Sequence, residues 1–170
     1  MFFSIVRRQA TPAYTALLNS IKVDLKLAMK AKQNTEKNTI RAILSTIKNN
    51  EIDGGEQSEF ELSKVLNKMI KQRIVSANEY QQQNRTDLAE VETQESDIIR
   101  KYVLSLPVAS DEEITKKIVD FLTDLKAKDS SMHVGAIFKQ ITDELANTWG
   151  AAPSVIKSKI PQLYKDIFQK

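Results

Sequence analysis

The 170-residue sequence contains no cysteine, one histidine, four glycines, four prolines and only 6% aromatic residues. Without cysteine the chain has no disulfide, no thiolate nucleophile and no cysteine-ligated metal site. Because His133 is the sole histidine, a zinc site with several histidine ligands is excluded. The scarcity of aromatic and turn residues argues against a β-sandwich or barrel and favours long helices.

The sequence also lacks long hydrophobic runs and glycine-rich loops. No run approaches the roughly 20 apolar residues that span a bilayer, so we expect no membrane insertion. The pair Gly54-Gly55 is the only glycine cluster, and it follows a predicted helix, whereas a phosphate-binding loop precedes one. The sequence therefore predicts no bound metal or nucleotide cofactor.

What is present is a chain rich enough in apolar residues to fold, with a small positive charge. Hydrophobic residues make up 41%, charged residues 28%, and the net charge is +3. The first fifteen residues hold Arg7 and Arg8 and no acid, so the remainder has 23 basic and 22 acidic residues (25 − 2 against 22). Because residues 16–170 carry a net charge of only +1, nucleic-acid binding would depend on local basic patches.

Residues 1–15 have the composition of a targeting segment. The stretch Met1–Val6 is apolar, two arginines follow, and no acidic residue occurs before Asp24. It is shorter than the apolar core of roughly 7–15 residues in a secretory signal. The composition predicts a mitochondrial presequence and a protein of the mitochondrial matrix. The alternative is an ordinary N-terminus that happens to carry two arginines.

Hydrophobic periodicity predicts an all-α protein without strands or repeats. We expect long antiparallel helices in an N-terminal domain of residues 16–106, followed by a three-helix bundle in residues 107–170. In the first helix, Leu18, Ile21, Leu25 and Met29 form the expected buried stripe. Helix starts are predicted at Thr11-Pro12, Asn34-Thr35, Ser58, Thr86, Ser110, Val134 and Pro153, and Pro161 should kink or split the last helix.

Basic residues recur on predicted helix faces in the first half of the chain. Residues spaced by three or four positions share one face of a helix. Such rows could contact a phosphate backbone, or they could form ordinary solvated faces. The candidates for binding tRNA or another partner are Lys22, Lys26, Lys30, Lys37, Arg41, Lys64, Lys68 and Lys71.

A charged stretch spans the predicted third and fourth helices. If they form a hairpin that turns near Asn84, Arg73 faces Glu95, and Glu92 lies on the same helix face as Glu95. The arginine and a glutamate could fix the register of the hairpin. The paired carboxylates could instead perform acid–base chemistry, although no nucleophile stands out in the sequence nearby.

This stretch resembles the signature of the YqeY-like family, which shares a motif with the tail of the GatB subunit of aminoacyl-tRNA amidotransferases. Two departures from the family pattern are a shorter spacer after Pro107 and a loop, Gly150-Ala151-Ala152-Pro153, that lacks an arginine and an aspartate. The similarity covers roughly residues 16–168, and the residues that match in order and spacing are Lys71, Gln72, Arg73, Ser76, Tyr80, Arg85, Asp87, Leu88, Ala89, Glu92 and Glu95.

The resemblance implies an all-helical fold in two parts and a relationship to the mitochondrial members found in fungi. It also implies the activity of a carbon–nitrogen ligase with glutamine as amido-N-donor, although no catalytic constellation is visible. In the amidotransferase the tail holds tRNA. The expected function is therefore a non-catalytic factor that binds tRNA or the mitochondrial amidotransferase in glutamine-dependent tRNA transamidation. The alternative is a mitochondrial protein-interaction module that binds no nucleic acid.

Overall fold

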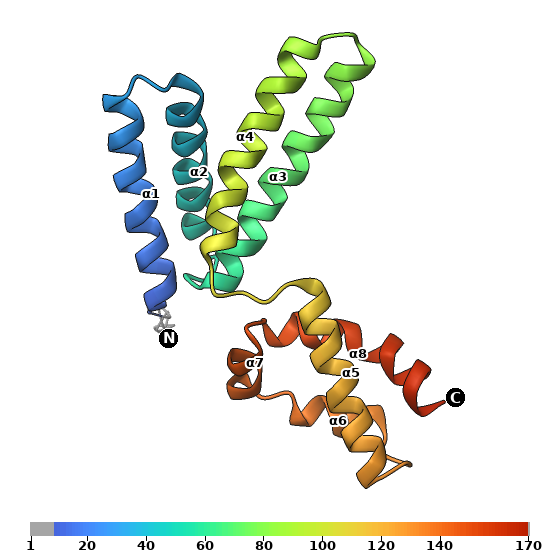
Figure 1. Ribbon diagram of the computed structural model, residues 1–170. Helices are drawn as coiled ribbons and strands as arrows, with labels where there is room; N and C mark the ends of the chain where they lie inside the picture. Colours follow the sequence, from blue (N-terminus) through green and yellow to red (C-terminus); the bar gives the residue numbers. More distant parts are fainter. Residues whose placement is uncertain (1–8, 170) are drawn as a thin grey trace, which may run out of the picture. The chain divides into compact units, whose positions relative to one another are not determined.

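The computed structural model describes residues 9–169, which form eight helices and no strand. The predicted all-α class is confirmed. Residues 1–8 of the predicted presequence lie outside the described part of the chain. The helices are α1 (Pro12–Lys30), α2 (Asn34–Ile52), α3 (Glu59–Gln82), α4 (Thr86–Ser105), α5 (Asp111–Lys128), α6 (Val134–Gln140), α7 (Asp143–Trp149) and α8 (Pro153–Phe168), as labelled in Figure 1.

The chain divides into two compact units, residues 1–107 and residues 108–170. The first unit consists of two helical hairpins, α1–α2 and α3–α4, and α2 packs against α4 (Figure 1). Its core contains β-branched and leucine side chains that are fully shielded from water, which favours folding through the hydrophobic effect. They are Ile21, Ile40, Ile43, Leu66 and Ile99, each with 0% exposure.

The buried face of α1 differs from the predicted stripe. Ile21 is buried as expected, but Leu18 and Leu25 are half-buried and Met29 is 50% exposed. The prediction that Met29 lies in the core is therefore wrong. The physical reason is that α1 is an edge helix packed mainly on α2, so its contact face is rotated relative to the stripe. The residues of α1 that are buried are Tyr14, Leu17, Ile21 and Ala28.

Most predicted helix caps are present. The Thr11 hydroxyl accepts a hydrogen bond from the Tyr14 amide, and Ser110 forms a complete capping box with Glu113. The Asn34 side chain does not cap α2 as predicted. Asn34 is already the first helical residue, and its Oδ1 accepts a hydrogen bond from the Lys37 ammonium at 2.8 Å.

The second unit contains four helices where three were expected. The segment predicted as one helix divides at Ile141 and Thr142, because the Thr142 hydroxyl caps α7 by accepting from the Leu145 amide at 3.2 Å. Pro161 lies inside α8, which continues through it, so the expected split does not occur. The centre of the unit is formed by Ile118, Leu122, Ile137, Ile156 and Ile160, each with 0% exposure.

The loop that departs from the family pattern has a structural role here. Gly150 ends α7 in the left-handed conformation at φ 70°, which glycine adopts without steric cost, and Ala151 is 1% exposed. Beside it, the Trp149 ring meets Phe121 edge-on at a centroid distance of 5.5 Å. His133 caps α6 by accepting a hydrogen bond from the Gly135 amide. Trp149 and His133 therefore both contribute to the folding of the second unit.

Candidate functional site

Arg73 on α3 is shared between two carboxylates on α4. Its Nη1 lies 3.2 Å from Oε2 of Glu92, and its Nε lies 3.1 Å from Oε2 of Glu95. All three side chains retain less than a third of their exposure. The predicted pairing of Arg73 with Glu95 is confirmed, and Glu92 joins it because residues three apart on α4 point the same way.

Glu95 is partly buried and lies beside a second carboxylate. Burial raises the pKa of Glu95, Arg73 lowers it by a smaller amount, and the neighbouring Glu92 charge raises it further. Its Oε2 is buried and, within the described residues, accepts no hydrogen bond of good geometry, so the Arg73 ion pair is its compensation. One guanidinium thus balances two carboxylates inside the hairpin.

Two motif residues, Arg85 and Asp87, form an ion pair just after the turn between α3 and α4. Asn84 adopts a φ of 57°, and Arg85 then donates two hydrogen bonds to Asp87, Nε to Oδ1 at 3.1 Å and Nη2 to Oδ2 at 3.0 Å. These bonds lower the pKa of Asp87. Because Arg85 and Asp87 are both exposed, the pair shapes the turn and contributes little to stability.

The remaining motif residues line the same hairpin. Ser76 and Tyr80 are half-buried, whereas Lys71 and Gln72 are exposed on the outer face of α3. Between the helices, the small side chains of Ala77 and Ala89 are 7% and 3% exposed. The motif therefore builds a closely packed hairpin with an internal charge cluster, and the register-fixing interpretation fits this geometry.

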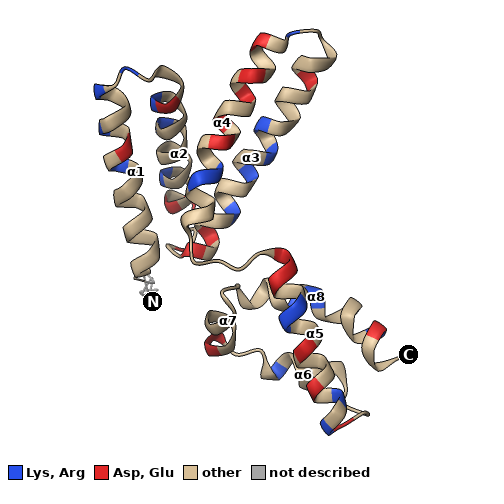
Figure 2. Ribbon diagram, viewed as in Figure 1, with Lys and Arg blue, Asp and Glu red and all other residues tan. Residues whose placement is uncertain are grey.

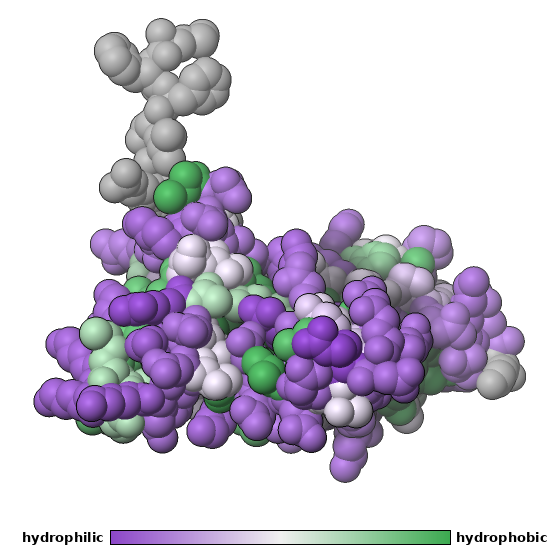
Figure 3. Space-filling model, turned by 90° about the horizontal axis from the view of Figure 1, so that it is seen from above, coloured by the Kyte–Doolittle hydropathy of each residue, from purple (hydrophilic) through white to green (hydrophobic). Residues whose placement is uncertain are grey.

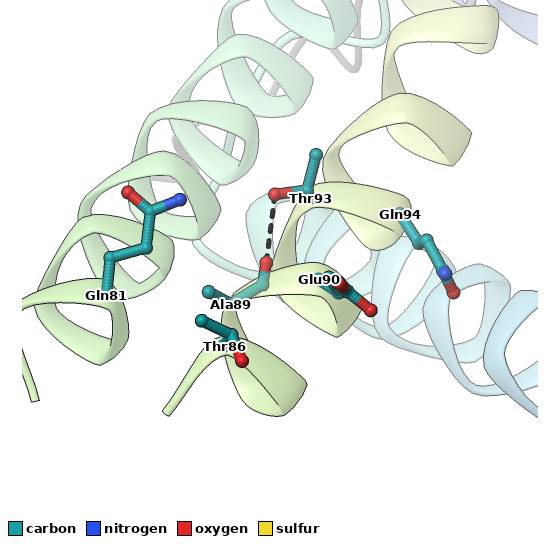
Figure 4. Close-up of a pocket in the computed structure, with 6 residues that line it drawn as sticks. All are labelled: Gln81, Thr86, Ala89, Glu90, Thr93 and Gln94. Carbon is teal, nitrogen blue, oxygen red and sulfur yellow. Dashed lines mark hydrogen bonds between the residues drawn. The ribbon is translucent and has the colours of Figure 1, made fainter. Parts of the chain in front are cut away.

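A shallow pocket of about 340 Å³ lies at the hairpin, with Gln81 from α3 and the other lining residues from α4 (Figure 4). The Thr93 hydroxyl donates to the Ala89 carbonyl at 2.9 Å, so it is engaged by its own helix. Glu90 is the one carboxylate among the lining residues. A second hollow, of about 440 Å³, lies between the start of α2 and α4 and includes Asp97 and Lys101. Neither brings the Glu92–Glu95 pair into a cavity.

The structure separates the predicted basic residues into several places. Those of α1, Lys22, Lys26 and Lys30, and those of α3, Lys64, Lys68 and Lys71, are all exposed. Lys64 pairs with Glu61 of its own helix at 3.1 Å. Figure 2 shows the two rows on different helices of the first unit, with α2 and α4 between them. On α2, Arg41 is exposed and Lys37 is half-buried. Six of the eight candidates thus form two separate rows, on α1 and α3, and the other two lie on α2.

Three buried or half-buried hydroxyl contacts in the first unit were not predicted. The Tyr14 hydroxyl donates to Glu51 at 2.6 Å, the Thr11 hydroxyl to Glu59 at 2.6 Å, and the Tyr102 hydroxyl to Asp24 at 3.0 Å. The first of these lowers the pKa of Glu51. Each joins residues more than 35 positions apart, so no local sequence signal could have revealed them.

Across residues 9–169, no cluster of three or more histidine, cysteine, aspartate or glutamate side chains is arranged to hold a metal ion. In the same part of the chain, no helix is long and apolar enough to cross a membrane. Figure 3 shows a mainly hydrophilic face on which hydrophobic residues form small patches.

The chain is an all-helical protein whose α3–α4 hairpin holds an internal Arg–Glu cluster and is followed by a small helical unit. A model of the Yqey-like protein family matches residues 18–159. The chain is a member of the YqeY-like family, as its motif residues predicted.

Among similar proteins, one from Clavispora lusitaniae is 71% identical over 170 residues and covers the whole of both chains. One from Meyerozyma guilliermondii is 40% identical over 164 residues, 96% of this chain and 86% of that protein. One from Vanderwaltozyma polyspora is 43% identical over 158 residues, 91% of this chain and 85% of that protein. All three are named "Altered inheritance of mitochondria protein 41, mitochondrial". These names support the prediction of a mitochondrial protein.

Proposed function

We propose that this protein is a non-catalytic factor of the mitochondrial matrix that binds tRNA and assists glutamine-dependent tRNA transamidation. Three points support the proposal: the mitochondrial names of its relatives, the YqeY-like motif with the resemblance to the amidotransferase tail that it implies, and an exposed basic row on α3. The ligase activity implied by the family resemblance is left out of the proposal. Both motif carboxylates are bound by Arg73, and neither lines the pockets described above.

The observation that carries the proposal is the row formed by Lys64, Lys68 and Lys71. The three lysines lie within two turns of one exposed helix face, and their hairpin keeps its acidic pair, Glu92 and Glu95, on the inner side around Arg73. A row of ammonium groups on a rigid helix can contact successive phosphates. Lys64 is paired with Glu61, whereas Lys68 and Lys71 form no ion pair within the described residues, so these two supply most of the positive charge of the row.

The test is tRNA binding by the full chain at several salt concentrations. We expect weak binding that falls steeply with salt, because neutralised phosphates release counterions. The variant Lys64→Glu, Lys68→Glu, Lys71→Glu should lose at least about tenfold in affinity. The matched variant Lys22→Glu, Lys26→Glu, Lys30→Glu makes the same charge change on α1 and should lose less. Equal binding by all three proteins would contradict the proposal.

A mitochondrial protein-docking module is the second candidate. The observation in its favour is the net charge of only +1 outside the first fifteen residues, which gives little long-range attraction for nucleic acid. Absence of tRNA binding by the wild-type chain at low salt would favour this candidate over the first.

A further inference from the structure

The outward side of α1 carries a row of residues at the spacing of a helix–helix interface. Ala16, Ser20, Val23 and Leu27 follow one another at intervals of four, three and four positions, and all are exposed. This alternation puts side chains in one line along a helix, as in the seam between two coiled-coil helices. We call these four residues the α1 seam.

The α1 seam carries two large apolar side chains where a solvent-facing helix surface is normally polar. Val23 and Leu27 retain 53% and 56% of their exposure, so both offer most of a branched apolar side chain to a partner. Ala16 and Ser20 are short and allow another helix to approach closely. The seam lies on a different side of α1 from the residues that pack on the first unit, and α1 is an edge helix (Figure 1).

The charges beside the α1 seam are positive. Lys22, Lys26 and Lys30 follow one another at intervals of four along one flank, and none forms an ion pair within residues 9–169. On the other flank, the Asp24 carboxylate is engaged by the Tyr102 hydroxyl at 3.0 Å. A partner that covers the seam therefore gains from acidic side chains along the lysine flank.

We infer that the α1 seam docks an amphipathic helix of a partner protein, with acidic residues along the edge that faces Lys22, Lys26 and Lys30. A phosphate backbone would use the lysines but would leave Val23 and Leu27 in water, whereas an acidic amphipathic helix satisfies both features. This surface is separate from the α3 row proposed to bind tRNA. The inference therefore does not depend on the tRNA proposal.

The first test uses two synthetic amphipathic helical peptides and the full chain. Both peptides carry leucine along one face; one carries glutamate along the adjoining edge and the other carries lysine. Measured by fluorescence anisotropy, the glutamate peptide should bind at least about tenfold more tightly than the lysine peptide, and salt should weaken its binding. No binding of the glutamate peptide, or equal binding of both peptides, overturns the inference.

The second test locates the binding. The variant Val23→Glu, Leu27→Glu should bind the glutamate peptide at least about tenfold more weakly. The two new carboxylates repel the glutamates of the peptide, and the apolar contact with its leucines is lost. The matched control Ile74→Glu, Val75→Glu changes two exposed apolar residues of α3, 42% and 55% exposed, and should bind as the wild type does. Circular dichroism checks that both variants are folded. Equal losses in the two variants overturn the inference.

Two further measurements exclude other occupants. Sedimentation of the wild-type chain that shows a dimer, lost in the Val23→Glu, Leu27→Glu variant, would assign the seam to a second copy and overturn the inference. Displacement of the bound glutamate peptide by tRNA would also overturn it. The Lys64→Glu, Lys68→Glu, Lys71→Glu variant should keep full peptide affinity, which separates this surface from the proposed tRNA surface.

Discussion

Arg73 is the residue at which the charges of the α3–α4 hairpin converge. It contacts Glu92 and Glu95 at 3.2 and 3.1 Å, and both carboxylates retain less than a fifth of their side-chain exposure. An ion pair that is partly removed from water gains little over an apolar pair, but breaking it leaves charge without compensation. The cluster therefore specifies how α3 and α4 align more than it adds to stability.

The first prediction concerns the loss of this arginine. Arg73→Ala should lower the free energy of unfolding by about 2 kcal/mol, because two half-buried carboxylates lose their shared cation. Lys64→Ala removes an exposed ion pair with Glu61 and should cost less than about 0.5 kcal/mol. Urea unfolding of both variants measures the difference. Equally small effects would show that the Arg73 cluster behaves like an ordinary exposed pair.

The second prediction concerns the pH dependence that Glu95 contributes. Because its pKa in the folded state is raised above the ordinary value of 4.5, the folded state binds the proton more tightly than the unfolded state does. Its contribution to stability is therefore greatest at or below about pH 4.5 and is lost as the pH rises through the raised value. Wild type should lose stability relative to Glu95→Gln between pH 4.5 and neutral pH.

Urea unfolding at the two pH values measures this difference, and Glu90→Gln, which alters an exposed carboxylate on the same helix, is the control. A constant stability difference between wild type and Glu95→Gln at both pH values would contradict the prediction.

At the scale of elements, the start of α1 is held firmly by the first unit. The Thr11 amide donates to the Gln57 carbonyl at 2.9 Å, and its hydroxyl donates to Glu59 at 2.6 Å. Tyr14 is 4% exposed and donates its hydroxyl to Glu51. Since these residues belong to the folded unit, removal of the whole predicted presequence of residues 1–15 would cut into α1.

The third prediction follows from these contacts. A chain that lacks residues 1–15 should be less stable than a chain that lacks residues 1–10 by about 3 kcal/mol or more, because it loses a buried tyrosine and the cap of α1. Urea unfolding of the two chains measures the difference. Sequencing the N-terminus of the imported protein should then place it before Thr11. A mature chain that begins after Tyr14 would contradict the prediction.

Local patterns predicted the helices well because their signals lie within a few residues. The Ser110–Glu113 capping box and Gly54, at φ 86°, each act on adjacent backbone, so they mark helix ends without tertiary contacts. The buried face of α1 depends on which helices pack together, and the periodicity of one helix does not contain that information. The break at Thr142 is a local cap, which the apolar periodicity of the segment concealed. The Arg73–Glu95 pair was predictable because the turn at Asn84 fixes the register of the hairpin.

At the scale of the whole molecule, charge is distributed unequally between the two units. Residues 108–170 contain nine lysines, no arginine and nine acidic residues, so their net charge is zero. Residues 1–107 therefore hold 16 basic and 13 acidic residues (25 − 9 and 22 − 9) and carry the entire net charge of +3. The loop Gly150–Pro153, where the resemblance would place a basic residue, holds the buried Ala151 and no charge.

The last prediction tests which unit binds tRNA. The motif that resembles the amidotransferase tail spans residues 71–95 and lies in the first unit, as does the row of Lys64, Lys68 and Lys71. The charge distribution also favours the first unit. We expect fragment 1–107, shown to be folded by circular dichroism, to keep the salt-dependent binding of the full chain. Fragment 108–170 has its own apolar core and should also fold, but it should bind at least about tenfold more weakly, because it has no excess of cations. Tight binding by fragment 108–170 would mean that shape or stacking contacts, rather than the lysine row, recognise the RNA.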